Sequence, residues 1–188
     1  MINQLYIKRV GYFYDFYSDE SLNFLKYSYS ISHKIFKGTT GELLDNNNLS
    51  VFTIFKKLKF IDFNDYLVLE LNSKKIGIYE YDKLNTCWYI EQENIKYSIL
   101  KNKGARFSIY KNESQIAGVI KNKIDFLNKS VYQFVTDDSK TINIQLALFL
   151  AINFDKSNED SALTFEINSP FHQESDKKWF SDRFKNLT

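Results

Sequence analysis

The segment at residues 141–155, TINIQLALFLAINFD, constrains the fold more than any other part of the chain. Its apolar residues cover every side of a helical wheel: Ile142, Ile144, Leu146, Leu148, Phe149, Leu150, Ile152 and Phe154. A helix that is apolar on all sides must be buried on all sides. At roughly 1.5 Å per residue it is about 20 Å long, short for a bilayer but suited to the interior of a small domain. We therefore predict a buried helix near the C-terminus.

The chain before this helix is typical of antiparallel strands. Short apolar and aromatic runs recur from about Leu22 to Phe134, separated by clusters of Asn, Asp, Gly or Lys. Aromatic residues make up 17% of the 188 residues, and there are 6 Gly and 1 Pro, which favours strands over a loop-rich chain. We predict a mostly β fold whose strands enclose the helix. The alternative is a helix that lies between a sheet and other elements.

Size, charge and cysteine content indicate one cytoplasmic domain without a strong overall electrostatic potential. The chain has no recognisable linker, and its formal net charge is only +2, which argues against nucleic-acid binding. Cys87 is the single cysteine, so a disulfide framework is excluded and a reducing compartment fits. The first residues, MINQLYIKRV, do not read as a signal peptide, and no run is apolar enough for a transmembrane helix.

The tail after the helix predicts one more strand and one more helix. The run SALTFEI, residues 161–167, has strand character. Beyond it, Ser169 and Pro170 suit the start of a helix, and Phe180, Phe184 and Leu187 recur at helical spacing.

Residues 115–155 resemble the LURP-one-related, tubby-like C-terminal family, whose superfamily includes phospholipid scramblases. The similarity lies in QIAGVIKNKIDFLNKSVYQFVTDDSKTINIQLALFLAINFD: a strand, a Lys-rich turn, a strand, an acidic turn and the apolar helix. The resemblance implies one tubby-like domain over residues 1–188, a closed antiparallel barrel of about a dozen strands around the helix. Its core would span about residues 22–155, with residues 156–188 as an extension. The Gly-rich DxxG turns of the family are absent from this sequence.

Two hairpins supply the candidate binding residues, if two-residue loops set their registers. A loop at Leu84 and Asn85 would turn Tyr79, Tyr81, Trp88 and Ile90 inward. The opposite face would then carry four carboxylates, called here the acidic face: Glu80, Asp82, Glu91 and Glu93. We read it as a solvated surface, with cation binding or acid–base chemistry as the alternative.

A loop at Glu113 and Ser114 would fix the second hairpin. Its inward residues would be Phe107, Ile109, Ile116, Gly118 and Ile120. At the end of this hairpin that is remote from its turn, we expect five cations to lie close together, with Tyr110 nearby on the outer face. This predicted basic patch comprises Lys101, Lys103, Arg106, Lys121 and Lys123. Such a patch suits an anionic lipid headgroup, a phosphate or an acidic protein surface. A second cluster, Lys56, Lys57 and Lys59, has no predicted register.

No catalytic, metal or cofactor motif is present in the sequence. His33 and His172 lie at opposite ends of the chain, and Cys87 has no basic neighbour. We therefore predict no catalytic residue, no metal and no cofactor. The leading hypothesis is a non-catalytic module that binds a protein partner with its outer surface, for instance as an inhibitor or immunity-type factor. The alternatives are a module for anionic lipid or phosphate, which the resemblance implies for some family members, and an enzyme that uses the acidic face.

Overall fold

The computed structural model describes residues 3–34, 38–56, 67–80, 87–102, 106–125, 129–152 and 154. They form twelve strands, a short 3-10 helix and one α-helix. The strands are β1 (Asn3–Val10), β2 (Phe13–Tyr17), β3 (Leu25–Lys34), β4 (Gly38–Asp45), β5 (Ser50–Lys56), β6 (Leu67–Leu71), β7 (Lys74–Glu80), β8 (Cys87–Gln92), β9 (Ile95–Asn102), β10 (Arg106–Lys111), β11 (Ser114–Asp125) and β12 (Lys129–Thr136). The helices are η1 (Ser139–Thr141) and α1 (Ile142–Ile152).

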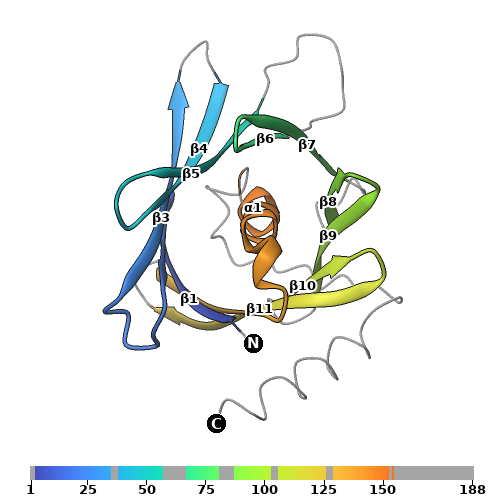
Figure 1. Ribbon diagram of the computed structural model, residues 1–188. Coiled ribbons are helices and arrows are strands. Elements are labelled where there is room, and N and C mark those ends of the chain that lie inside the picture. The colour runs from blue at the N-terminus through green and yellow to red at the C-terminus, as the bar shows by residue number, and fades with distance from the viewer. Residues whose placement is uncertain are drawn as a thin grey trace.

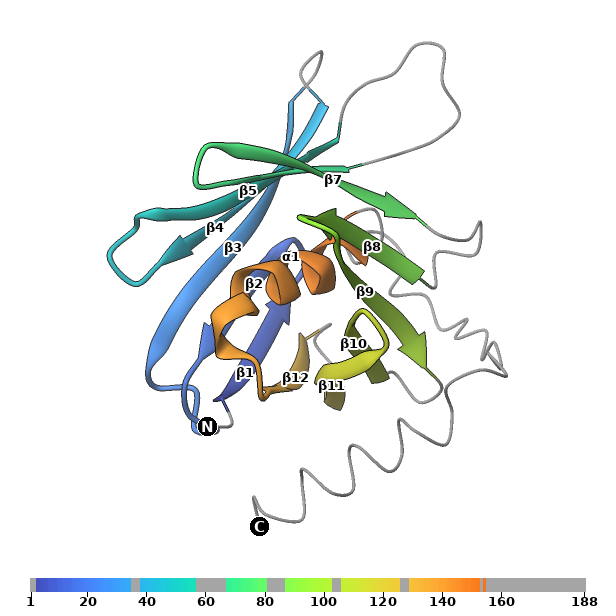
Figure 2. The same ribbon diagram turned by 45° about the vertical axis from the view of Figure 1, so that its right-hand side comes forward.

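The strands form a closed antiparallel barrel. Each strand pairs with its neighbours in sequence, and β1 pairs with β12 to close the ring. Figure 1 looks along the barrel and shows α1 in the middle of the ring of strands, and the turned view in Figure 2 shows α1 surrounded by them as well. The predicted mostly β fold with a closed antiparallel barrel is therefore confirmed. The extra C-terminal strand and helix predicted within residues 156–188 lie outside the described residues.

The barrel begins earlier in the chain than the predicted core. β1 and β2 both precede Leu22, and β1 provides the closing seam with β12. Leu5 and Ile7 of β1 point into the core with Tyr14 and Phe16 of β2. Residues 3–17 are thus part of the ring.

Two tight turns fix the registers on either side of β7 and β8. Asn72 and Ser73 join β6 to β7, and both have positive φ angles of 51° and 61°. Glu93 and Asn94 join β8 to β9 with φ angles of 52° and 63°. Two successive positive φ values define a type I′ turn, whose twist matches that of the flanking strands. These hairpins are therefore tightly registered.

The helix α1 fills the interior of the barrel. All of its residues from Ile144 to Ile152 are buried, as the all-round apolar pattern predicted. Phe149 contacts three rings edge-on, with centroid separations of 6.4 Å to Tyr14, 5.6 Å to Phe107 and 5.5 Å to Tyr132. Since these rings come from β2, β10 and β12, one helical side chain ties together strands that are distant in sequence.

A polar cluster holds the chain where it enters the barrel, here called the entry latch: Lys111, Asp138, Thr141 and Gln145. The buried Gln145 donates from Nε2 to the Asp138 carbonyl at 2.7 Å and to Thr141 Oγ1 at 2.9 Å. Lys111 Nζ lies 3.2 Å from Asp138 Oδ2. This hydrogen bond, with help from the charge of Asp138, raises the pKa of Lys111. The latch joins the start of α1 to β10.

Candidate functional site

The register between β7 and β8 differs by one residue from the predicted one. Tyr79 lies opposite Tyr89, and Glu80 lies opposite Trp88. A shift of one residue in the register moves every side chain of one strand to the other face relative to its partner strand. Tyr79, predicted to point inward, therefore lies outside and is 43% exposed, whereas Trp88 and Ile90 point inward as predicted.

This slip divides the predicted acidic face. Glu80 is on the core side of the sheet with Trp88, while Glu91 is exposed on the outer side. Glu93 lies in the turn after β8, and its Oε1 is 3.9 Å from Lys74 Nζ. Asp82 is outside the described residues. Glu80 and Glu91 consequently do not converge on one site.

The second hairpin shows the same kind of difference. Its turn lies at Asn112 and Glu113, one residue earlier than predicted, and a bulge follows Ile109. Phe107 and Ile109 point inward and Ile116 is buried, as predicted. Opposite them, however, lie Val119 and Ala117 instead of Ile120 and Gly118.

The members of the predicted basic patch are placed on different sides of the sheet. Lys101 lies opposite Phe107, and Lys121 opposite Tyr132, so both are on the core side near one end of the barrel. Arg106 lies opposite Asn102 on the outer side. Tyr110 is 6% exposed, so it offers little outer surface. Lys103 and the side chain of Lys123 are outside the described residues, as are Lys57 and Lys59 of the second lysine cluster.

Sequence reasoning missed a cation at the same end of the barrel. Arg9 is only 6% exposed and lies on the core side of β1, opposite Ser130. Its guanidinium lies 5.4 Å from the centroid of the Tyr14 ring, and its Nε donates to the Gly11 carbonyl at 3.2 Å. The alternation Leu5, Ile7, Arg9 along β1 was the signal that could have placed it inward.

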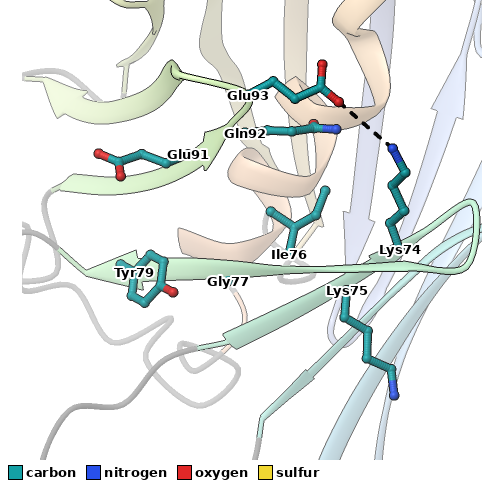
Figure 3. A pocket seen from close by; sticks show the side chains of 8 residues that line it. All are labelled: Lys74, Lys75, Ile76, Gly77, Tyr79, Glu91, Gln92 and Glu93. Atoms are coloured by element: carbon teal, nitrogen blue, oxygen red, sulfur yellow. Dashed lines mark ion pairs between the residues drawn. The ribbon is translucent and has the colours of Figure 1, made fainter.

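A pocket opens on the described surface at the seam between β7 and β8. Among the described residues these strands pair over three residues, from Ile78 to Glu80 on β7, whereas β7 pairs with β6 over five and β8 with β9 over six. A pocket of about 550 Å³ lies where they separate. It is lined by Lys74, Lys75, Ile76, Gly77, Tyr79, Glu91, Gln92 and Glu93. Figure 3 shows β7 and β8 along its two sides, with the Lys74–Glu93 ion pair across it.

Aromatic side chains cover the closed part of the seam. Tyr79 and Tyr89 stack with their ring centroids 5.4 Å apart, and Lys96 Nζ lies 4.6 Å from the Tyr89 centroid. The Tyr79 ring lies over Gly77, where a Cβ atom would collide with it. Tyrosines that are partly exposed and held in place are common in binding surfaces.

Among the described residues, no group of His, Cys, Asp or Glu side chains has the arrangement of a metal site. Within the same ranges no helix has the length and apolarity needed to cross a membrane. Cys87 is buried. His172 and the side chain of His33 are outside the described part of the chain.

Comparison of the chain with family models, curated proteins and solved structures finds no match.

Proposed function

We propose that this protein is a non-catalytic binding module that recognises a protein partner with its outer surface. One observation carries the proposal: the barrel interior is occupied by its own helix, with every residue from Ile144 to Ile152 buried. Barrels without such a helix can hold a ligand in their interior, but here the helix occupies that space. Binding is left to the outside, where the seam combines a pocket with the exposed Tyr79 and charges of both signs. An inhibitor or immunity-type role fits such a module.

Affinity capture from the native cell lysate tests this function. Tagged wild-type chain should retain one protein in stoichiometric amount, and Tyr79→Ala should retain at least tenfold less, about 1.4 kcal/mol, which is typical of an aromatic residue central to an interface. The matched control is Phe13→Ala. Phe13 is also an exposed aromatic, at 61%, but it lies on β2, five strands away around the ring. Equal capture by wild type and both variants would place the interface elsewhere, and no captured protein would contradict the proposal.

A second candidate function is binding of an anionic lipid or phosphate. It is favoured by the three cations on the core side at one end of the barrel: Arg9, Lys101 and Lys121. Sedimentation with vesicles that contain phosphatidylserine should then increase with the anionic lipid fraction and weaken with salt. Lys101→Gln with Lys121→Gln should reduce it. Binding that is the same for neutral vesicles would reject this candidate.

We also propose that the chain belongs to the tubby-like family. The support is architectural: a closed ring of antiparallel strands around a C-terminal apolar helix is what the resemblance implies. An enzymatic role of the acidic face is not favoured, because Glu80 and Glu91 lie on opposite sides of the sheet.

A further inference from the structure

The outer side of the barrel wall is buried over β10, β11 and β12. Where solvent lies outside an antiparallel barrel, buried and less buried residues alternate along each strand. β1, β2 and β5 follow this alternation. In contrast, residues 107–110 of β10, 116–119 of β11 and 134–136 of β12 are buried without interruption. These three strands are therefore covered on both faces.

The register identifies which side chains of these strands point away from the core. Phe107 contacts Phe149 of the enclosed helix, so the next residue, Ser108, points outward. Ser108 lies opposite Gly118, and Gly118 lies opposite Val135. Residues that face each other on paired strands share one side of the sheet. Ser108, Gly118 and Val135 therefore form a row on the outside of the barrel, here called the covered face.

Side chains of neighbouring strands do not account for the burial of this row. Val135 is 0% exposed, yet its cross-strand neighbours are Gly118, which has no side chain, and Gln4, which is only partly buried. Within the described ranges every strand belongs to the ring and α1 lies inside it. A sheet face that is buried packs against a further layer. The layer over the covered face therefore comes from a part of the chain beyond those ranges.

We propose that residues 156–188 form this layer and that the covered face is their docking surface. This segment is the longest part of the chain beyond the described ranges, and it follows the enclosed helix in the sequence. The helix predicted within it carries Phe180, Phe184 and Leu187 at helical spacing, which is the apolar stripe that a sheet face can bury. The inference goes beyond the proposed function, which concerns the seam between β7 and β8.

The dimensions of the face and of the predicted helix match. A helix from Pro170 to Leu187 would be about 27 Å long at roughly 1.5 Å per residue. Adjacent strands lie about 4.8 Å apart, so the row across β10, β11 and β12 is about 10 Å wide. One helix, about 10 Å in diameter, is enough to cover it. Gly118 lies in the middle of the row, and a glycine inside a strand lets another element approach the sheet closely.

Paramagnetic relaxation in the full chain tests this docking. Asn186→Cys in a Cys87→Ser background provides a single cysteine for a nitroxide label, beside the apolar stripe but not part of it. The label should strongly weaken the amide NMR signals of the covered face, because paramagnetic broadening falls steeply with distance. As the matched control, the same label at the exposed Asn46, in the turn between β4 and β5, should leave these signals unchanged.

A pair of variants of the labelled chain tests the apolar stripe. Phe180→Asp with Phe184→Asp places charges on the side of the predicted helix that would meet the sheet, so the weakening of the signals should be lost. Asp182→Ala changes the opposite side of that helix and should preserve the weakening. Circular dichroism and the thermal midpoint establish that both variants are folded.

Three results would overturn the proposal. Amide signals of the covered face that keep full intensity in the labelled chain would leave the connections between strands as its cover. Equal weakening in a mixture of nitroxide-labelled chain and isotope-labelled chain without nitroxide would mean that a second copy covers the face. Signals that stay weakened with both phenylalanines changed to aspartate would reject the apolar stripe. If the aspartate variant does not fold, the labelled chain and the mixture decide.

Discussion

Truncation of Phe149 to alanine measures how much the enclosed helix contributes to stability. Phe149 is 0% exposed and contacts the rings of Tyr14, Phe107 and Tyr132 edge-on. Large-to-small changes at buried phenylalanines cost about 3–5 kcal/mol, and each aromatic pair adds roughly 0.5–1.5 kcal/mol beyond area burial. With three pairs lost at once, Phe149→Ala should cost about 4–5 kcal/mol, at the upper end of the first range.

Urea unfolding followed by tryptophan fluorescence gives the free energy directly, because Trp88 is in the same core cluster. In a thermal scan the midpoint should fall by about 8–20 °C, at roughly 2–4 °C per kcal/mol for a domain of this size. Phe13→Ala is the control, since an exposed ring should change the free energy by no more than about 0.5 kcal/mol. A loss below about 1 kcal/mol for Phe149→Ala would refute the argument that the helix is enclosed by the strands.

Two further predictions test the entry latch and a close approach in the barrel wall. Lys111→Ala should cost about 0.5–1 kcal/mol at pH 7, because the ion pair with Asp138 is partly exposed. The raised pKa of Lys111 means that this stabilisation is complete below the usual value of 10.5 and lost as the pH rises through the higher folded-state value. Urea unfolding at pH 7 and pH 11.5 should therefore show the difference between wild type and variant shrinking, and an unchanged difference would contradict it. Gly41→Ala should destabilise by about 1–3 kcal/mol, since its Cβ would collide with the Tyr29 hydroxyl end. In a double-mutant cycle Tyr29→Leu should remove most of that cost, and strict additivity would contradict the steric explanation.

The helix and the fold class could be predicted because neither depends on register. Apolar side chains lie on every side of the helix at residues 142–152, so no rotation offers a polar face to solvent. The helix must therefore lie inside the fold. The presence of most strands could likewise be predicted from local apolar and aromatic runs, but the first two strands were missed. There β1 places Arg9 at a core position after Leu5 and Ile7, which breaks the apolar alternation, and β2 carries aromatic side chains on both of its faces.

The faces of the hairpins could not be predicted, because a single residue in a turn decides them. The usual signal for a type I′ turn is Asn-Gly, yet here the two turns around β7 and β8 are Asn72–Ser73 and Glu93–Asn94. The register of β7 with β8 also differs by one residue from the one that a two-residue loop at Leu84 and Asn85 would give, so Tyr79 lies opposite Tyr89. The acidic face and the basic patch were both built on such assumed loops, which is why neither assembles as expected.

The length of pairing between β7 and β8 is a tertiary property that no local pattern encodes. Each strand is secured elsewhere: β7 by five residue pairs to β6, and β8 by six to β9. The helix packs chiefly against β5, β8 and β9, so β8 is also held by the core. Because each strand of the seam is held by its other neighbour, and the helix fills the core behind them, the barrel stays closed although the pairing described between β7 and β8 is short.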